Sequence, residues 1–192
     1  MFLRLFFVLG ISCIISSCTT GITVATTGAQ AVYDRHTLKQ KMTDNYITMQ
    51  AYRKIYTDTH RYDGTNIAVA TFHNEVLLTG EASQINQIRE VEQIVKDIPN
   101  VNEVHNHLSV AGVSSTLTSA SDSWITAKIK AKLIAIDEVD PSQIKVVTEN
   151  GTVYLMGIVF PEQAETAAEV AAETAGVQEV IKHFSYLRIS KT

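Results

Sequence analysis

The chain contains two copies of one sequence pattern. Residues 67–110 align with residues 144–186, which are one residue shorter, with a single-residue gap in the second copy before Val177. Apolar residues and glycines recur at matching positions: Val69/Val146, Val76/Val153, Leu78/Leu155, Gly80/Gly157, Val101/Val177 and Val104/Val180. Such a duplication indicates two small domains with the same arrangement of helices and strands. Because the matched positions are those of a core, function is expected where the copies differ.

The N-terminus has the features of a secretion signal. Arg4 precedes an apolar run, residues 5–15, which is too short to span a bilayer but has the length of a signal-peptide core. The run ends in Ile-Ser-Ser-Cys at 15–18, which resembles the lipobox of bacterial lipoproteins. We therefore expect residues 1–17 to be removed and Cys18 to carry lipid. An ordinary cleaved signal with an unmodified Cys18 is the alternative.

The residue after the cysteine and the bulk composition narrow the environment further. Thr19 is not the Asp that retains such lipoproteins at the inner membrane, so we expect an outer-membrane protein facing the periplasm. With Cys18 acylated, no free thiol remains for disulfides, zinc ligation or catalysis. Removal of Arg4 leaves 15 Lys+Arg against 20 Asp+Glu, a formal net charge of about −5. No nucleic-acid-binding surface is expected from this balance.

Sequence patterns divide the mature chain into a tether (18–42), a first domain (43–110), a Ser/Thr-rich linker (111–121) and a second domain (122–192). In the first domain they predict a helix near 43–56, strands at 67–72 and 75–79, a helix near 84–97 and a strand at 101–110. In the second they predict a helix near 122–136, a hairpin turn at 149–151 and a helix near 161–174, with Asn150-Gly151 as a strong turn signal.

Each domain is therefore predicted to have the order α-β-β-α-β. The helix between the second and third strands favours a right-handed parallel crossover. Together these features predict an α+β fold, in which a three-stranded mixed sheet is covered on one face by two helices.

The residues also carry a family resemblance. The pattern Val-x-Leu-x-Gly, then a helix, then Gly/Asn-Val-x-x-Val, resembles the BON domain. Both copies have it, at 76–80 with 100–104 and at 153–157 with 176–180. The first copy ends in Asn106-His107-Leu108, close to the family's Asn-x-Leu, whereas Lys182-His183-Phe184 departs from it. A lipobox followed by two such domains is similar to the dual BON-domain outer-membrane lipoproteins linked to cell division and envelope stress.

This resemblance implies a non-enzymatic protein whose second domain binds anionic phospholipid, such as phosphatidylglycerol or cardiolipin. The sequence itself contains none of the common nucleophile, phosphate-binding, dinucleotide-binding or zinc motifs. We expect no cofactor and no metal. His105 and His107 should share one half-exposed sheet face, without an evident third ligand. Gly80 and Gly157 end equivalent strands and are expected to be structural, required by positive φ or by close packing.

The first helices of the two copies differ in a way that suggests function. In the second copy Ile125, Ile129, Leu133 and Ile136 form the expected buried stripe. Trp124, Lys128 and Lys132 lie about 100° around that helix, with Lys130 elsewhere on its polar surface, and no acidic residue occurs between Asp122 and Asp137. Indole and lysine side chains suit an anionic headgroup layer. Together with the family resemblance, this makes these four residues the predicted lipid-binding site. The alternative is that Trp124 packs inside the domain or against the linker and the lysines form a solvated face.

Two further expectations concern the surroundings of this helix. The other helix of the second domain carries Glu162, Glu165, Glu169 and Glu173, so the domain could turn its basic helix toward lipid and its acidic helix away. The alternative function is a scaffold for outer-membrane assembly, division or peptidoglycan-linked proteins. It would use exposed sheet faces or an aromatic surface of the first domain, although we expect several of these tyrosines in domain–domain packing: Tyr46, Tyr52, Tyr56 and Tyr62.

Overall fold

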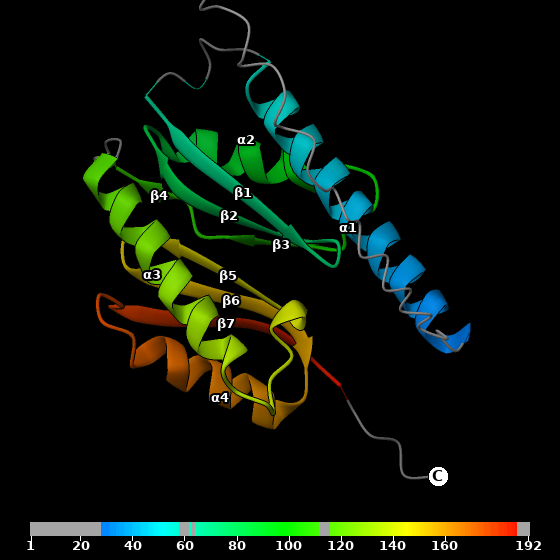
Figure 1. The fold of residues 1–192 in the computed structure, drawn as a ribbon. Coiled ribbons are helices and arrows are strands. Elements are labelled where there is room, and N and C mark those ends of the chain that lie inside the picture. The colour runs from blue at the N-terminus through cyan, green and yellow to red at the C-terminus, as the bar shows by residue number, and fades with distance from the viewer. Residues whose placement is uncertain (1–27, 58–61, 63, 112–115, 188–192) are drawn as a thin grey trace, which may run out of the picture.

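The computed structural model describes residues 28–57, 62, 64–111 and 116–187. The predicted signal peptide, Cys18 and the segment up to residue 27 lie outside these residues. Figure 1 shows two similar α+β domains, each with a sheet whose outer face carries two helices. The predicted fold class is thereby confirmed.

The first domain consists of α1 (Gly28–Ile55), β1 (Asn66–Phe72), β2 (Glu75–Ala82), α2 (Ile85–Lys96), β3 (Glu103–Asn106) and β4 (Ser109–Val110). Strand β1 pairs with β2 in antiparallel orientation, and both β3 and β4 run parallel to β2. The single strand predicted at 101–110 is thus interrupted at residues 107–108. The core of the first domain is closed by α1 and α2 and contains Ile47, Ala51, Ile55, Tyr62, Ile67, Val69, Val76, Leu78, Val91, Val95 and Ile98.

The second domain repeats this layout with α3 (Thr116–Ile134), the short 3-10 helix η1 (Pro141–Gln143), β5 (Ile144–Glu149), β6 (Thr152–Val159), α4 (Pro161–Ala172) and β7 (Glu179–Tyr186). Strand β6 lies between antiparallel β5 and parallel β7. Its core contains Ile125, Ile129, Leu133, Val139, Ile144, Val146, Val153, Leu155, Val159, Ala164, Ala167 and Ala171. The predicted crossover through a helix is therefore present in both domains.

The predicted starts of two helices were wrong, because the first helix of each domain begins earlier than expected. Helix α1 starts at Gly28, inside the predicted tether, and α3 starts at Thr116, inside the predicted linker. Residues 29–42 include several good helix formers and no proline or glycine. Once the docked part of the helix has formed, each added residue gains a backbone hydrogen bond at small cost, so the helix extends beyond the domain.

A carboxylate attaches each first helix to the hairpin of its own sheet. In the first domain Asp44 accepts hydrogen bonds from the backbone N–H groups of His73 and Asn74, at 3.0 and 2.9 Å. In the second, Asp122 accepts from Asn150 and Gly151, at 2.8 and 2.9 Å. Both carboxylates are buried. Each carboxylate is therefore held by two backbone N–H groups inside its own domain.

Gly80 and Gly157 lie within β2 and β6, two residues before each strand ends, so the prediction that they end these strands was wrong. The two glycines are required for different reasons. Gly80 has φ +106°, and a Cβ there would lie 1.9 Å from the carbonyl oxygen of Asn66. A Cβ on Gly157 would lie 2.5 Å from the carbonyl oxygen of Gln143. Positive φ thus explains the first, as expected. Close packing explains the second, although the neighbour is backbone before β5 and not the following helix.

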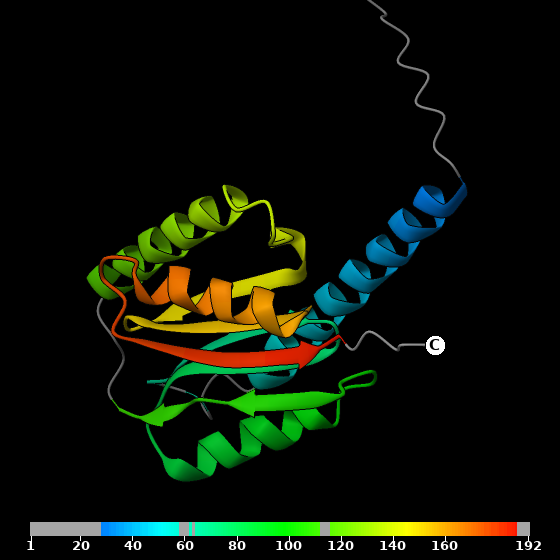
Figure 2. The same ribbon diagram turned by 90° about the horizontal axis from the view of Figure 1, so that it is seen from below.

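The two sheets pack against each other with their helices on the outside (Figures 1 and 2). Leu77, Tyr154 and Met156 form the buried centre of this interface, flanked by Ala70, Phe72, Val147 and Ile181. Leu77 and Tyr154 occupy equivalent positions in the two copies, as do Ala70 and Val147. The expectation of exposed sheet faces was wrong, because each copy covers the other.

Three histidines meet in the same interface. The Nε2 atoms of His107 and His183 are 2.9 Å apart, and the ring of His105 stacks on His183 with centroids 4.0 Å apart. His105 also contacts Glu75 at 3.1 Å and Glu103 at 3.7 Å. His105 and His107 therefore share one face, as predicted, but the face is an interface. His183 is the third histidine that was not expected nearby.

Burial, followed by the charges of His105 and His107, lowers the pKa of His183 from its usual 6.5 to about 4. Burial is also the main cause that lowers the pKa of His107, partly opposed by Glu179. A lowered histidine pKa means that the packed state binds fewer protons than the unfolded state. Protonation of these two histidines therefore weakens the interface as pH falls from 6.5 toward 4.

We predict that alanine at Gly80 or Gly157 destabilises its domain by roughly 2–4 kcal/mol, because backbone must move to admit the new Cβ. Urea denaturation measures this loss. Ser123→Ala, at an exposed position of α3, is the control and should change the free energy of unfolding by less than about 0.5 kcal/mol. A Gly157→Ala protein as stable as wild type would contradict the close-packing explanation.

We also predict that the melting temperature falls more steeply with pH in the wild type than in His107→Gln/His183→Gln, over the range from 6.5 to 4. Glutamine retains hydrogen-bonding groups but takes up no proton. Differential scanning calorimetry at closely spaced pH values makes the comparison. Parallel curves for the two proteins would show that these rings do not couple protonation to domain packing.

Candidate functional site

Helix α3 has a fully apolar inner side and an unusual outer side. Ile125, Ile129 and Leu133 are at most 3% exposed and Ile136 packs against the same core, as the spacing predicted. Trp124 is 66% exposed. The chain's single tryptophan therefore stands outside the domain, at a position fixed by the burial of its immediate neighbour Ile125.

The structure brings Lys128 and Lys132 to the same side of α3 as Trp124. The Lys128 ammonium lies 5.9 Å from the centroid of the indole ring. It also donates a hydrogen bond to the carbonyl of Ala175 at 2.6 Å, and Lys132 reaches the carbonyl of Glu173 at 3.5 Å. These carbonyls follow the C-terminal end of α4, where the helix dipole attracts positive charge.

Lys128 and Lys132 are thus partly engaged within the domain, which the sequence did not reveal. An ammonium group has three donors, so one carbonyl contact leaves donors for another acceptor. The contact also holds the Lys128 ammonium beside the indole. The arrangement holds positive charge next to Trp124. Because the ammonium groups also contact carbonyl oxygens, their attraction for an anionic ligand is reduced.

Lys130 is not part of this group. It lies two positions along the chain from Lys128 and from Lys132, which turns its side chain toward another side of the helix. Lys130 instead acts on Lys145 of β5. Burial is the main cause that lowers the pKa of Lys145, and the positive charge of Lys130 lowers it further. Of the four residues predicted to bind lipid, the structure therefore brings three together.

Ile134 is a residue of this surface that was missed in the sequence. It is 71% exposed and lies ten residues after Trp124, about 15 Å along the helix axis. The exposed residues Ala127 and Ala131 lie between them at spacings of three and four. This i, i+3, i+7, i+10 series was present in the sequence, but it was hidden by the stronger buried stripe beside it.

The acidic helix α4 packs beside α3 on the same sheet. Glu162, Glu165, Glu169 and Glu173 are all exposed, as their spacing predicted. Glu165 forms an ion pair with Lys182 of β7 at 2.8 Å. The second domain therefore separates its charges, with positive groups on α3 and negative groups on α4.

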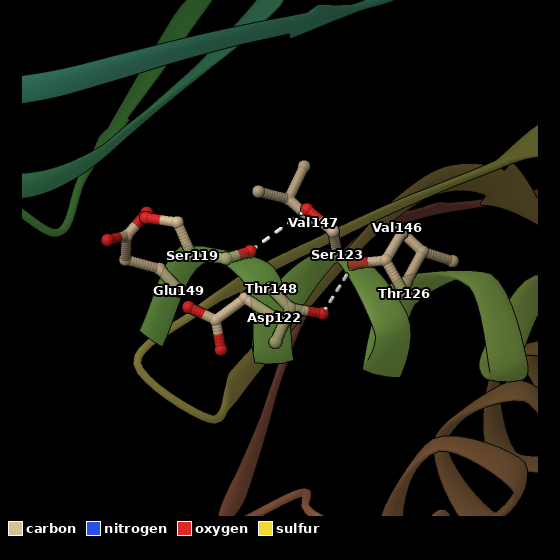
Figure 3. A pocket seen from close by; sticks show the side chains of 8 residues that line it. All are labelled: Ser119, Asp122, Ser123, Thr126, Val146, Val147, Thr148 and Glu149. Atoms are coloured by element: carbon tan, nitrogen blue, oxygen red, sulfur yellow. Dashed lines mark hydrogen bonds between the residues drawn. The ribbon is translucent and has the colours of Figure 1, made fainter. Parts of the chain in front are cut away.

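A pocket of about 430 Å³ lies between α3 and the free edge of β5 (Figure 3). Its walls include Ser119, Ser123 and the hydrogen-bonded hydroxyls of Thr126 and Thr148, 2.7 Å apart. Asp122 and Glu149 also line it, and burial together with the charges of Glu81 and Asp122 raises the pKa of Glu149. Acidic groups make this pocket unsuited to an anionic headgroup.

Three of the four tyrosines expected in domain–domain packing contact their own domain instead: Tyr52, Tyr56 and Tyr62. Tyr52 and Tyr56 stack with centroids 6.2 Å apart. The Tyr52 hydroxyl accepts from the backbone N–H of Val69 at 3.0 Å, and the Tyr56 hydroxyl lies 3.3 Å from both backbone polar groups of Ile67. They close the free edge of β1, and Tyr62 is buried in the domain's own core. The expected interdomain role was wrong.

Two other properties of the described residues bear on function. None of their helices is both long enough and apolar enough to cross a membrane. Across the same parts of the chain, no three His, Cys, Asp or Glu side chains are grouped as a metal would require.

Comparison with known proteins agrees with this architecture. The model of the BON domain family matches residues 43–112 and again residues 121–188. The 21 kDa hemolysin of Actinobacillus pleuropneumoniae is 35% identical over 131 residues, 68% of either chain. The outer membrane lipoprotein DolP of Haemophilus influenzae is 30% identical over 159 residues, covering 83% of this chain and 82% of that protein.

A third relative is the osmotically-inducible protein Y of Escherichia coli, 32% identical over 142 residues, which are 72% of this chain and 70% of that protein. The family model covers more than half of the chain, and its two matches coincide with the two duplicated domains described above. The chain therefore belongs to the BON domain family and carries two copies of the domain.

Proposed function

We propose that this protein is an outer-membrane lipoprotein, anchored through acylated Cys18 and facing the periplasm, that binds anionic phospholipid through α3. In this role it helps to maintain the cell envelope, at division sites and under stress. The lipobox-like sequence at 15–18 supports the anchor. So does the name of one relative, an outer membrane lipoprotein. The name of another relative, osmotically inducible, agrees with a role under stress. The proposed activity is binding, without catalysis.

The exposure of Trp124 carries the proposal. An indole that is 66% exposed on a folded domain leaves a large apolar surface in water. Its ring prefers the headgroup level of a bilayer, where the apolar body and the N–H are both satisfied. Ile134, at 71% exposure, extends the apolar surface along the same helix. Both residues would lose contact with water on a membrane.

The charges favour an anionic surface. Each lysine close to such a surface contributes about 1 kcal/mol, and salt screens this attraction beyond roughly 8–10 Å. The carbonyl contacts of Lys128 and Lys132 reduce the gain, so the lipid-free domain should bind weakly. A membrane anchor at Cys18 would raise the effective concentration of α3 at the bilayer and make weak binding sufficient.

Charge separation within the second domain supports one orientation. Cationic α3 is attracted to the bilayer, while the exposed carboxylates of α4 are repelled by it. The protein as a whole is net negative, so this local separation is what permits approach to an anionic surface. The proposal therefore places α3 on the membrane and the glutamates of α4 toward the aqueous side.

We predict that Trp124→Glu, or Lys128→Glu with Lys132→Glu, lowers the affinity of residues 19–192 for phosphatidylglycerol or cardiolipin vesicles by about tenfold or more, equivalent to at least about 1.4 kcal/mol. Co-sedimentation with vesicles of graded charge and salt measures the affinity. The melting temperature should barely change for Trp124→Glu, since the side chain is exposed.

Lys130→Glu is the matched control, because it changes charge on the same helix away from Trp124. Its effect should be clearly smaller than that of either site variant. Equal losses for Lys130→Glu and Trp124→Glu would point to overall charge and not to this surface. Unchanged binding in Trp124→Glu would exclude α3 as the lipid-binding helix.

A further inference from the structure

Helix α1 of the first domain also has an exposed apolar side. Met42 is 73% exposed, Leu38 61% and Met49 59%. Tyr46 and Tyr56, at 43% and 38%, lie along the same side. Spacings of four and seven residues from Leu38 to Met42, Met49 and Tyr56 place these side chains in one row along the helix. Few soluble helices leave such a row uncovered.

This row lies opposite the part of α1 that enters the core. Ile47, Ala51 and Ile55 are 0% exposed and face the sheet. Tyr52 and Tyr56 use their hydroxyls at the edge of β1, which orients the helix. Leu38, Met42 and Met49 therefore project away from the first domain and are not needed to hold it together, whereas Tyr56, at the end of the row, also contacts β1.

The row is the counterpart of the surface on α3. Asp44 and Asp122 make the same hairpin contacts, so they align the two helices. From this alignment Tyr46 corresponds to Trp124, and Tyr56 corresponds to Ile134. The duplicated domains thus expose large apolar residues at equivalent positions, although the residue types differ.

Charge on α1 is suited to an anionic surface. Lys39, Lys41 and Arg53 are exposed and flank the apolar row. Asp44 is the single acidic residue from 38 to 57, and it is buried in its contacts with the hairpin. An apolar row bordered by Lys and Arg is the pattern of a helix that lies in a membrane interface.

The position of α1 along the chain favours the same occupant. Its first residue, Gly28, follows Cys18 by ten residues, which span at most about 35 Å when fully extended. An acyl anchor at Cys18 would therefore keep the start of α1 near the bilayer. Figure 2 shows the N-terminal half of α1 extending beyond the two sheets.

We propose that α1 is a second membrane-contact surface, which places Leu38, Met42 and Met49 in the headgroup layer of an anionic leaflet. This inference rests on the proposed lipid-binding function. It adds α1 of the first domain to α3 of the second domain as a membrane-contacting helix. The first domain then shares in membrane binding, and the two contacts together fix how the molecule stands on the bilayer.

The direct test measures the depth of each helix in the membrane. In the mature protein Cys18 carries the acyl anchor and no free thiol remains. Met49→Cys or Ile134→Cys therefore introduces a single site for a nitroxide label. The labelled proteins are reconstituted into phosphatidylglycerol-containing liposomes, and power-saturation electron paramagnetic resonance reports contact with lipid or water. Glu169→Cys on α4 is the aqueous control.

We expect the labels at 49 and 134 to lie in the interface and the label at 169 in water. A label in water at 49, with the label at 134 in lipid, would overturn this inference and leave the proposed function standing. Labels in water at both positions would overturn both.

A matched pair of variants tests the apolar row itself. Met42→Glu with Met49→Glu should lower the affinity of acyl-free residues 19–192 for phosphatidylglycerol vesicles about tenfold. Met42→Leu with Met49→Leu retains the apolar row and should bind like wild type. All of these side chains are exposed, so the melting temperatures should agree.

Equal vesicle affinity in the Glu and Leu pairs would overturn the inference. A second copy of the chain is the competing occupant. Sedimentation velocity without lipid would then show a dimer in wild type that the Glu pair loses, and this result would also overturn the membrane assignment. A monomer in all variants, with the expected loss of vesicle binding, supports it.

Discussion

The packing of one sheet on its duplicate determines what the rest of the molecule can do. Leu77, Tyr154 and Met156 bury the faces that a single BON domain of this kind would leave in water. Because equivalent residues meet, the contact resembles the interface of a symmetric dimer joined into one chain. It turns all four helices outward. The surfaces left for binding are therefore helical, and sheet-face docking of a partner is no longer available.

The two copies attach their first helix to the sheet in the same way but expose different residues on it. Asp44 and Asp122 fix each first helix to its hairpin in the same way. On this helix the second copy presents an indole with lysines, while the first uses tyrosines at the edge of β1 and methionines outside. Duplication thus supplied two similarly placed helices that differ in what they offer a membrane.

Local patterns in the sequence predicted most of the fold. Alternation and helical spacing predicted the strands, the four helices and the buried stripe of α3. Contacts between distant residues were not predictable in this way. The meeting of His107 with His183, the carbonyl contacts of Lys128, and the tyrosine hydroxyls on β1 all depend on tertiary packing. The early start of α1 was not predicted, because residues 18–42 were interpreted as a tether although residues 29–42 include several good helix formers.

The most direct test of the central claim uses the chain's single tryptophan. Its fluorescence reports Trp124 alone, because no other indole is present. On addition of phosphatidylglycerol vesicles, the account predicts a blue shift of the emission and quenching by lipids brominated near the headgroup. Neutral phosphatidylcholine vesicles should give much smaller changes. An emission spectrum that does not respond to anionic vesicles, under conditions where the protein is bound to them, would contradict the account.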